Sequence, residues 1–204
     1  MGLDSSKLPL PIRKSNFSAS TLSLPSLALT KSKKYRKVLI LSLDAAGKTT
    51  FLYRVKTGQL LNTIPTIGYN HERIEYKSSM FDLWDVGGQD EVRKNWGNYF
   101  FNVQAVIFIV DSNDRERMDE VRTELRRVEK FLQQNRRMNA VILILANKQD
   151  LPEAMTYHEL HSTLFQSRSQ KFHWEMRTCC NKTGEGVMEA LEWLHKELKR
   201  RYRK

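Results

Sequence analysis

Residues 42–49 read Ser-Leu-Asp-Ala-Ala-Gly-Lys-Thr, and this stretch decides the fold. It follows the apolar run Val38–Leu41 and opens the segment Gly47–Lys56, which reads as a helix. A strand, a short loop and a helix form a context in which backbone N–H groups and the helix dipole bind phosphate. Lys48 can then reach the β- and γ-phosphates of a nucleotide, and the Thr49 hydroxyl can bind Mg²⁺. The expected phosphate-binding residues are Asp44, Ala45, Ala46, Gly47, Lys48, Thr49 and Thr50.

This loop departs from the usual sequence at one position. The first residue of the pattern GxxxxGK[ST] is normally a glycine, which gives backbone freedom or allows close approach, and here it is Ser42. Serine is small and can adopt the same conformation at a modest cost. The departure leaves the affinity for nucleotide open. A helix start without any ligand is the competing interpretation, and the motifs further along the chain argue against it.

The 204-residue chain has a formal net charge of +11, which is unevenly distributed. Residues 1–37 hold eight basic residues and one acidic residue, and residues 196–204 hold six basic residues and one acidic residue. The part between them is close to neutral. A nucleic-acid-binding domain would carry its basic residues on folded elements, so this distribution argues against a nucleic acid partner. The length and a hydrophobic content of 40% suit one α/β domain.

Apolar runs alternate with amphipathic segments through the middle of the chain. The runs that predict strands are Val38–Leu41, Ala105–Val110 and Ala140–Ala146. The helices expected after the first one are Arg115–Gln134, Thr156–Phe165 and a last helix whose apolar face is Val187, Ala190, Leu191, Leu194 and Leu198. Tyr69–Tyr76 and Met80–Trp84 predict a hairpin. Strands that alternate with helices, with one hairpin, predict a doubly wound α/β sheet.

Two further segments supply groups that can sense a terminal phosphate. Asp85 ends the second hairpin strand and can hold Mg²⁺ through water, and Thr66 is a second candidate Mg²⁺ ligand beside Thr49. The N–H of Gly88 can approach the γ-phosphate, and Gln89 can orient an attacking water. Taken singly, Asp85 could be a helix cap and Thr66 a turn residue. Their spacing after a phosphate loop favours the nucleotide interpretation.

Asn147-Lys148-Gln149-Asp150 follows the apolar run Ala140–Ala146 and predicts a guanine-binding turn. The carboxylate of Asp150 can accept hydrogen bonds from N1–H and the 2-amino group of guanine, whereas adenine would leave that carboxylate unpaired. The aliphatic stem of Lys148 can lie over the base, and we expect Asn147 to brace the loops. A P-loop ATPase or kinase is therefore disfavoured.

Five stretches together resemble the Arf and Arf-like family of small GTPases. They are LDAAGKTT at 43–50, IPTIGYN at 64–70, WDVGGQD at 84–90, VDSNDRER at 110–117 and ANKQDLP at 146–152. The resemblance extends from about Lys37 to Lys199. It implies a P-loop small GTPase fold, an α/β architecture with a six-stranded, mostly parallel sheet and helices on both faces.

The resemblance also implies a function. Members of the family are GTP-binding switches that bind GTP or GDP with Mg²⁺, hydrolyse GTP slowly and recruit effectors in the GTP state, here with Gln89 and Lys48 as the catalytic residues. An exchange factor and a GTPase-activating protein control the cycle, and membrane trafficking is the expected setting. Effectors of the family bind an aromatic cluster, and the matching residues here are Tyr69, Trp84 and Tyr99. The last guanine-binding loop is matched by Cys180 and Asn181.

The sequence leaves the hydrolytic rate open. The motifs place no arginine beside the γ-phosphate, so we expect slow intrinsic turnover and an arginine supplied by the activating protein. The alternative is a scaffold that binds GTP and hardly hydrolyses it; an intact Gln89 argues against this alternative, and Ser42 keeps it open. The expected form is a monomer.

The ends of the chain suggest attachment to a membrane. Gly2, with Ser6 at the expected spacing, fits the N-myristoylation pattern, and a single myristoyl chain needs a second signal such as basic residues near an anionic surface. The expected domains are a flexible basic extension at 1–34, a GTPase domain at 35–199 and a basic tail at 200–204. A cytoplasmic location with peripheral membrane association follows. The alternatives are that residues 1–34 are a transit peptide that directs the protein to an organelle, or that they are a solvated tail.

Overall fold

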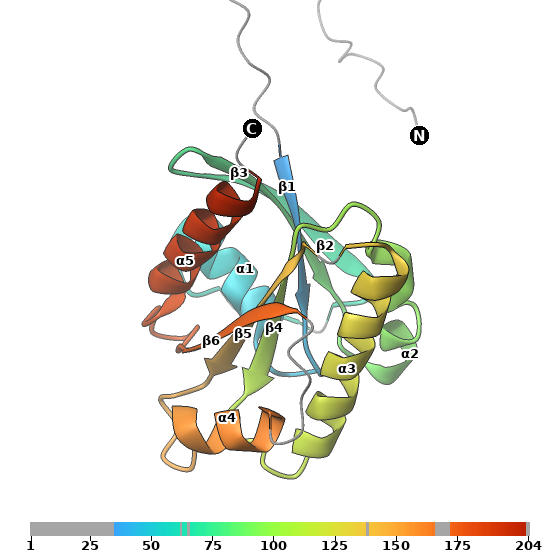
Figure 1. The fold of residues 1–204 in the computed structure, drawn as a ribbon. Helices are drawn as coiled ribbons and strands as arrows, with labels where there is room; N and C mark the ends of the chain where they lie inside the picture. Colours follow the sequence, from blue (N-terminus) through green and yellow to red (C-terminus); the bar gives the residue numbers. More distant parts are fainter. Residues whose placement is uncertain (1–34, 62, 65, 138, 166–171, 203–204) are drawn as a thin grey trace, which may run out of the picture. The chain divides into compact units, whose positions relative to one another are not determined.

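The centre of the sheet is built from runs of β-branched and aliphatic residues that are buried on both faces. The structure is a computed structural model that describes residues 35–202 except 62, 65, 138 and 166–171. Its strands are β1 (Tyr35–Leu41), β2 (Tyr69–Tyr76), β3 (Ser79–Val86), β4 (Ala105–Asp111), β5 (Val141–Asn147) and β6 (His173–Thr178). In the described residues they form a six-stranded sheet in the order β2-β3-β1-β4-β5-β6, where the β2–β3 pair is antiparallel and the other pairs are parallel (Figure 1).

Helices cover both faces of this sheet (Figure 1). They are α1 (Lys48–Thr57), α2 (Asp90–Arg93), α3 (Met118–Gln134), α4 (Tyr157–Phe165) and α5 (Val187–Arg201), with a 3-10 helix at Trp96–Tyr99. Successive residues of β1 point to opposite faces. Val38 and Ile40 pack in a cluster with α1 and α5, whereas Leu39 and Leu41 pack in a cluster with α3 and α4. The sheet therefore lies between two hydrophobic cores and forms a rigid base for the loops at its edge.

The predicted α/β fold is confirmed. The differences concern the ends of elements and the strand β6, which the apolar pattern of the sequence does not locate. α3 begins at Met118 rather than Arg115, because Asp114 accepts a hydrogen bond from the N–H of Arg117 at 3.4 Å and holds a turn there. α5 continues to Arg201, where Glu197 forms ion pairs with Arg200 and Arg201. The helix thus includes two residues of the segment predicted as a basic tail. The predicted extension at 1–34, which contains Gly2, lies outside the described residues.

Three of the functional segments predicted from the sequence follow strand ends at one edge of the sheet. Because β1, β3, β4 and β5 are mutually parallel, their carboxyl ends meet at the same edge. These segments are residues 42–47 after β1, residues 87–89 after β3 and residues 148–150 after β5. In open α/β sheets this edge is where ligands bind.

Candidate nucleotide-binding site

The loop after β1 turns sharply before α1 begins. Ala45 has a φ of 57° and Gly47 has a φ of 97°, and these left-handed conformations turn the chain into the helix. A Cβ at Gly47 would lie 2.6 Å from Nδ2 of Asn147, so this position also requires a residue without a side chain. The loop lines a cavity of about 340 Å³. The predicted residues that line it are Asp44, Ala45, Gly47, Lys48, Thr49, Thr50, Thr66, Gly88 and Gln89.

Lys48 is held beneath this loop and is only 6% exposed. Its Nζ donates hydrogen bonds to Oγ of Ser42 at 2.7 Å and to the carbonyl oxygen of Leu43 at 3.0 Å. Burial lowers the pKa of Lys48 to about 8, and the negative charges of Asp85 and Asp44 oppose part of that fall. A phosphate group would stabilise the buried ammonium further, so the site favours an anionic ligand.

Two hydroxyls and a carboxylate converge beside the cavity. Oγ1 of Thr49 donates to Oδ2 of Asp85 at 2.8 Å and lies 2.9 Å from Oγ1 of Thr66. Asn70, the last residue of the IPTIGYN stretch, has no role predicted from the sequence. It donates from Nδ2 to Oδ2 of Asp85 at 3.1 Å and to Oγ1 of Thr66 at 3.3 Å. The other oxygen of this fully buried carboxylate, Oδ1 of Asp85, has no hydrogen-bond partner among the described residues. An oxygen-rich cluster with an unpaired buried carboxylate oxygen suits a hard divalent cation.

The loop after β3 passes close to Lys48. A Cβ at Gly88 would lie 2.5 Å from Nζ of Lys48 and 2.6 Å from the carbonyl oxygen of Leu43, so only glycine fits here. Gln89 follows at the start of α2, where it is exposed and lines the cavity. Arg93 of α2 donates to the carbonyl oxygen of Gly88 at 2.7 Å and fixes the path of the loop.

Three loops are tied together by the amides of two asparagines. Nδ2 of Asn147 donates to the carbonyl oxygen of Ala46 at 2.8 Å, and its Oδ1 accepts from the backbone N–H of Asn181 at 2.9 Å. Nδ2 of Asn181 donates to the carbonyl oxygen of Gly47 at 3.1 Å. The bracing role predicted for Asn147 therefore matches its contacts, and Asn181 contributes a side chain as well as its backbone.

Lys148 and Asp150 are each held by a neighbouring group. Lys148 has a φ of 66°, and its Nζ pairs with Oδ2 of Asp111 at 2.5 Å. The carboxylate of Asp150 accepts from Sγ of Cys180 at 3.3 Å and from Nζ of Lys182 at 3.4 Å. The hydrogen bond from Cys180 is the main reason that the pKa of Asp150 lies below its usual value, so this carboxylate is kept ionised.

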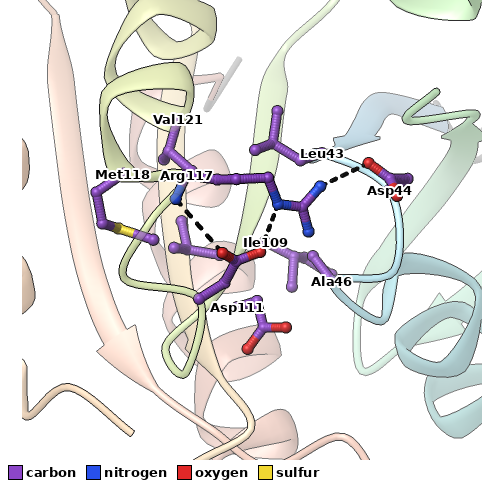
Figure 2. A pocket seen from close by; sticks show the side chains of 10 residues that line it. Leu43, Asp44, Ala46, Ile109, Asp111, Arg117, Met118 and Val121 are labelled. Atoms are coloured by element: carbon purple, nitrogen blue, oxygen red, sulfur yellow. Dashed lines mark hydrogen bonds and ion pairs between the residues drawn. The ribbon is translucent and has the colours of Figure 1, made fainter. Parts of the chain in front are cut away.

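Arg117, at the turn before α3, makes a further contact that the sequence motifs do not indicate. Figure 2 shows its guanidinium reaching toward Asp44 of the phosphate loop, above Ile109 and Ala46. Nη1 pairs with Oδ1 of Asp44 at 2.7 Å, and Nε pairs with Oδ2 of Asp114 at 2.5 Å. The ion pair with Asp44 connects the phosphate loop to the segment that follows β4.

Comparison with known proteins agrees with this geometry. The family model of the ADP-ribosylation factor (Arf) family matches residues 23–198 of the chain. The chain belongs to the Arf family. Among solved structures, this Arf-family protein is similar to the small GTPase Arl6 (BBS3) of Trypanosoma brucei with the bound nucleotide analogue GppNp, at 30% sequence identity and a TM-score of 0.75. The match covers 82% of this chain and 99% of the Arl6 chain, which supports a P-loop GTPase fold and guanine nucleotide binding in general.

The aromatic residues predicted as an effector surface lie together in this Arf-family protein. The ring of Tyr69 stacks on Trp84 with centroids 5.0 Å apart and meets Tyr99 edge-on at 5.7 Å. His71 adds a fourth ring, 4.5 Å from Trp84, and its Nε2 pairs with Asp82 at 2.7 Å. Tyr69 is 49% exposed, so this aromatic cluster is accessible at the surface.

We also searched the Arf-family chain for side-chain clusters that could hold a metal ion and for membrane-spanning helices. In the part that the structure describes, no group of three or more His, Cys, Asp and Glu residues could hold a metal ion. Among the same residues, no helix has both the length and the apolar character needed to cross a membrane.

Proposed function

We propose that this Arf-family protein is a molecular switch that binds GTP with Mg²⁺, hydrolyses it slowly to GDP and recruits effectors while GTP is bound. The observation that carries the proposal is the meeting of three chain segments around one cavity. The hydroxyls of Thr49 and Thr66 and the carboxylate of Asp85 lie within 3.4 Å of one another, and Gln89 lines the cavity beside them. Thr66 and Gln89 come from the segments on either side of the β2–β3 hairpin, so one ligand can order both.

The residues present fit a magnesium ion. Thr49 and Thr66 would hold it directly through their hydroxyl oxygens, and Asp85 would hold it through water. The unpaired Oδ1 of Asp85 supports this assignment, because a buried carboxylate oxygen without a donor is otherwise costly. When bound, Mg²⁺ would neutralise negative charge on the phosphates.

Hydrolysis would depend on positioning by residues of this chain. Lys48 would contact the β- and γ-phosphates, the N–H of Gly88 would approach the γ-phosphate, and Gln89 would orient the attacking water. Arg93 pairs with Asp90 and Glu120, and Arg117 pairs with Asp44 and Asp114, so both guanidiniums are already engaged by carboxylates. These ion pairs support slow intrinsic turnover that an activating protein accelerates with its own arginine.

Single-turnover hydrolysis of GTP tests this proposal. The full chain is loaded with GTP and Mg²⁺, and the wild-type protein is compared with Gln89→Leu and with the matched control Gln59→Leu, another exposed glutamine outside the cavity. We expect Gln89→Leu to slow hydrolysis at least about tenfold, whereas Gln59→Leu keeps the wild-type rate. Equal rates for the two variants would refute the role of Gln89. Tight GTP binding without measurable wild-type hydrolysis would favour the non-hydrolysing scaffold.

We also propose where effectors and a membrane would bind. The aromatic cluster of Tyr69, Trp84 and Tyr99 lies on the hairpin and the 3-10 helix, next to both γ-phosphate-sensing loops, and exposed aromatic residues are frequent anchors of protein interfaces. A Tyr69→Ala variant that still binds GTP normally should fail to bind the effector proteins that the GTP-loaded wild type binds.

For the membrane, the supporting observation is that the first strand and the end of the last helix of the domain meet, and that both are rich in basic residues. Nη2 of Arg36 in β1 donates to the carbonyl oxygen of Tyr202 at 3.0 Å, directly after the basic end of α5. This surface and a myristoyl group on Gly2 would act together on an anionic membrane in the cytoplasm, in the setting of membrane trafficking. Mass spectrometry of the native N-terminus separates myristoyl-Gly2 from a cleaved transit peptide and from an unmodified end.

A further inference from the structure

Ser42 stands where the phosphate loop usually has its first glycine, and its side chain is fully buried. Its Oγ accepts a hydrogen bond from Nζ of Lys48 at 2.7 Å and donates to the carbonyl oxygen of Leu43. The same carbonyl oxygen accepts a second hydrogen bond from Lys48, at 3.0 Å. Ser42, Leu43 and Lys48 therefore form a closed triangle of hydrogen bonds under the loop.

This triangle limits what Lys48 can offer to a ligand. An ammonium group has three N–H donors and no acceptor. Two of those donors are directed to Oγ of Ser42 and to the carbonyl oxygen of Leu43, which leaves one. A glycine at position 42 would have no Oγ, so the ammonium would have two donors for phosphate oxygens. Gly88 packs so closely on another side that a Cβ there would lie 2.5 Å from Nζ, and the ammonium therefore has little room to find a different position.

We propose that Ser42 is a positioning residue that sets the preference between GDP and GTP by occupying one donor of Lys48. The inference rests on the proposed function, in which the β- and γ-phosphates lie against Lys48. One free donor satisfies a β-phosphate oxygen. A γ-phosphate oxygen then gains its hydrogen bond only when Lys48 gives up its bond to Ser42 or to Leu43. The hydroxyl therefore costs GTP one hydrogen bond and costs GDP none.

Removal of the hydroxyl should therefore favour GTP selectively. One net hydrogen bond corresponds to about a fivefold change in affinity. We expect Ser42→Ala to tighten binding of a non-hydrolysable GTP analogue about fivefold and to change GDP binding less than about twofold. Ser42→Gly should act in the same direction, because both substitutions remove the same Oγ.

The experiment measures association and dissociation of mant-GDP and mant-GppNHp with the full chain at fixed Mg²⁺, for wild type, Ser42→Ala and Ser42→Gly. Ser112→Ala is the matched control, because Ser112 is also fully buried and its Oγ has no hydrogen-bond partner in the described part of the chain. A selective gain for mant-GppNHp in both Ser42 variants, with no change in Ser112→Ala, supports the proposal.

Three results would overturn it. The first is an unchanged ratio of the two affinities in both Ser42 variants, which would show that the hydroxyl does not distinguish the nucleotides. The second is a gain in Ser42→Gly alone, which would assign the effect to backbone freedom. The third is a wild-type chain that retains neither labelled nucleotide, and this result would also refute the proposed function, whereas the first two would leave it intact.

Discussion

Truncation of Asn147 to alanine should weaken the whole loop framework of the site. The side chain is buried, and its amide makes two short hydrogen bonds to backbone groups. It donates to the carbonyl oxygen of Ala46 at 2.8 Å and accepts from the N–H of Asn181 at 2.9 Å, besides a weaker hydrogen bond from Sγ of Cys179 at 3.7 Å. Alanine would leave these two buried backbone groups without their hydrogen bonds to the side chain, at a cost of about 1–3 kcal/mol each. We therefore expect a loss of about 3 kcal/mol in the free energy of unfolding. For a domain of this size that corresponds to a fall in Tm of roughly 6–12 °C.

Thermal unfolding followed by circular dichroism measures this effect in the GDP-loaded protein. The matched control is Asn135→Ala at the end of α3, where one partly buried hydrogen bond to the carbonyl oxygen of Phe131 at 2.9 Å would be lost away from the site. The control should lose about 1 kcal/mol. If Asn147→Ala lowers Tm no more than Asn135→Ala does, the bracing role inferred for Asn147 is wrong.

Two further predictions concern the nucleotide site, and a third concerns the end of α5. Asp150→Asn should weaken GTP binding at least about 100-fold in a competition assay and improve binding of xanthosine triphosphate, because the amide cannot accept both guanine N–H groups; an unchanged GTP affinity contradicts the guanine assignment. Gly88→Ala should abolish exchange of GDP for GTP while the fold persists by circular dichroism, because the added Cβ meets Lys48 and backbone at 2.5–2.6 Å; normal exchange contradicts the close approach. Ion pairs with Arg200 and Arg201 lower the pKa of Glu197 to about 2, so the stabilisation by this carboxylate is complete above pH 4.5 and is lost as the pH falls toward 2. The Tm difference between wild type and Glu197→Gln should therefore shrink on acidification, and a difference that grows contradicts this.

The fold can be predicted from the sequence because its signals are local. β4 and β5 consist almost entirely of apolar residues, β1 contains the apolar run Val38–Leu41, and the apolar face of α5 repeats with a helical period. These patterns can be recognised without knowledge of distant contacts. The sequence pattern does not delimit β6, because its burial is partial and irregular, as expected of an edge strand. The predicted start of α3 is wrong because a side chain of the turn competes for the backbone N–H groups.

The candidate site can be predicted only in part. Motifs identify the groups that face a ligand, because phosphate and guanine recognition requires particular residue types at particular spacings. Asn70, Asp111 and Arg117 lie within the quoted stretches, but the motifs do not indicate their roles, which arise from contacts across the sheet edge. Ser42 is visible in the sequence as a departure from the pattern, but its hydrogen bond to Lys48 depends on three-dimensional geometry.

The bracing of the phosphate loop has a consequence for biosynthesis. The hydrogen bond between Asn147 and Ala46 spans 101 residues, and the bond between Asn181 and Gly47 spans 134 residues. On a ribosome the phosphate loop emerges early, yet the atoms that hold it in place are made much later. Contacts of this kind close large loops and form late in folding. A nascent chain would therefore acquire its nucleotide only near the end of synthesis, and a chain truncated before residue 181 would carry an intact phosphate motif without the framework that supports it.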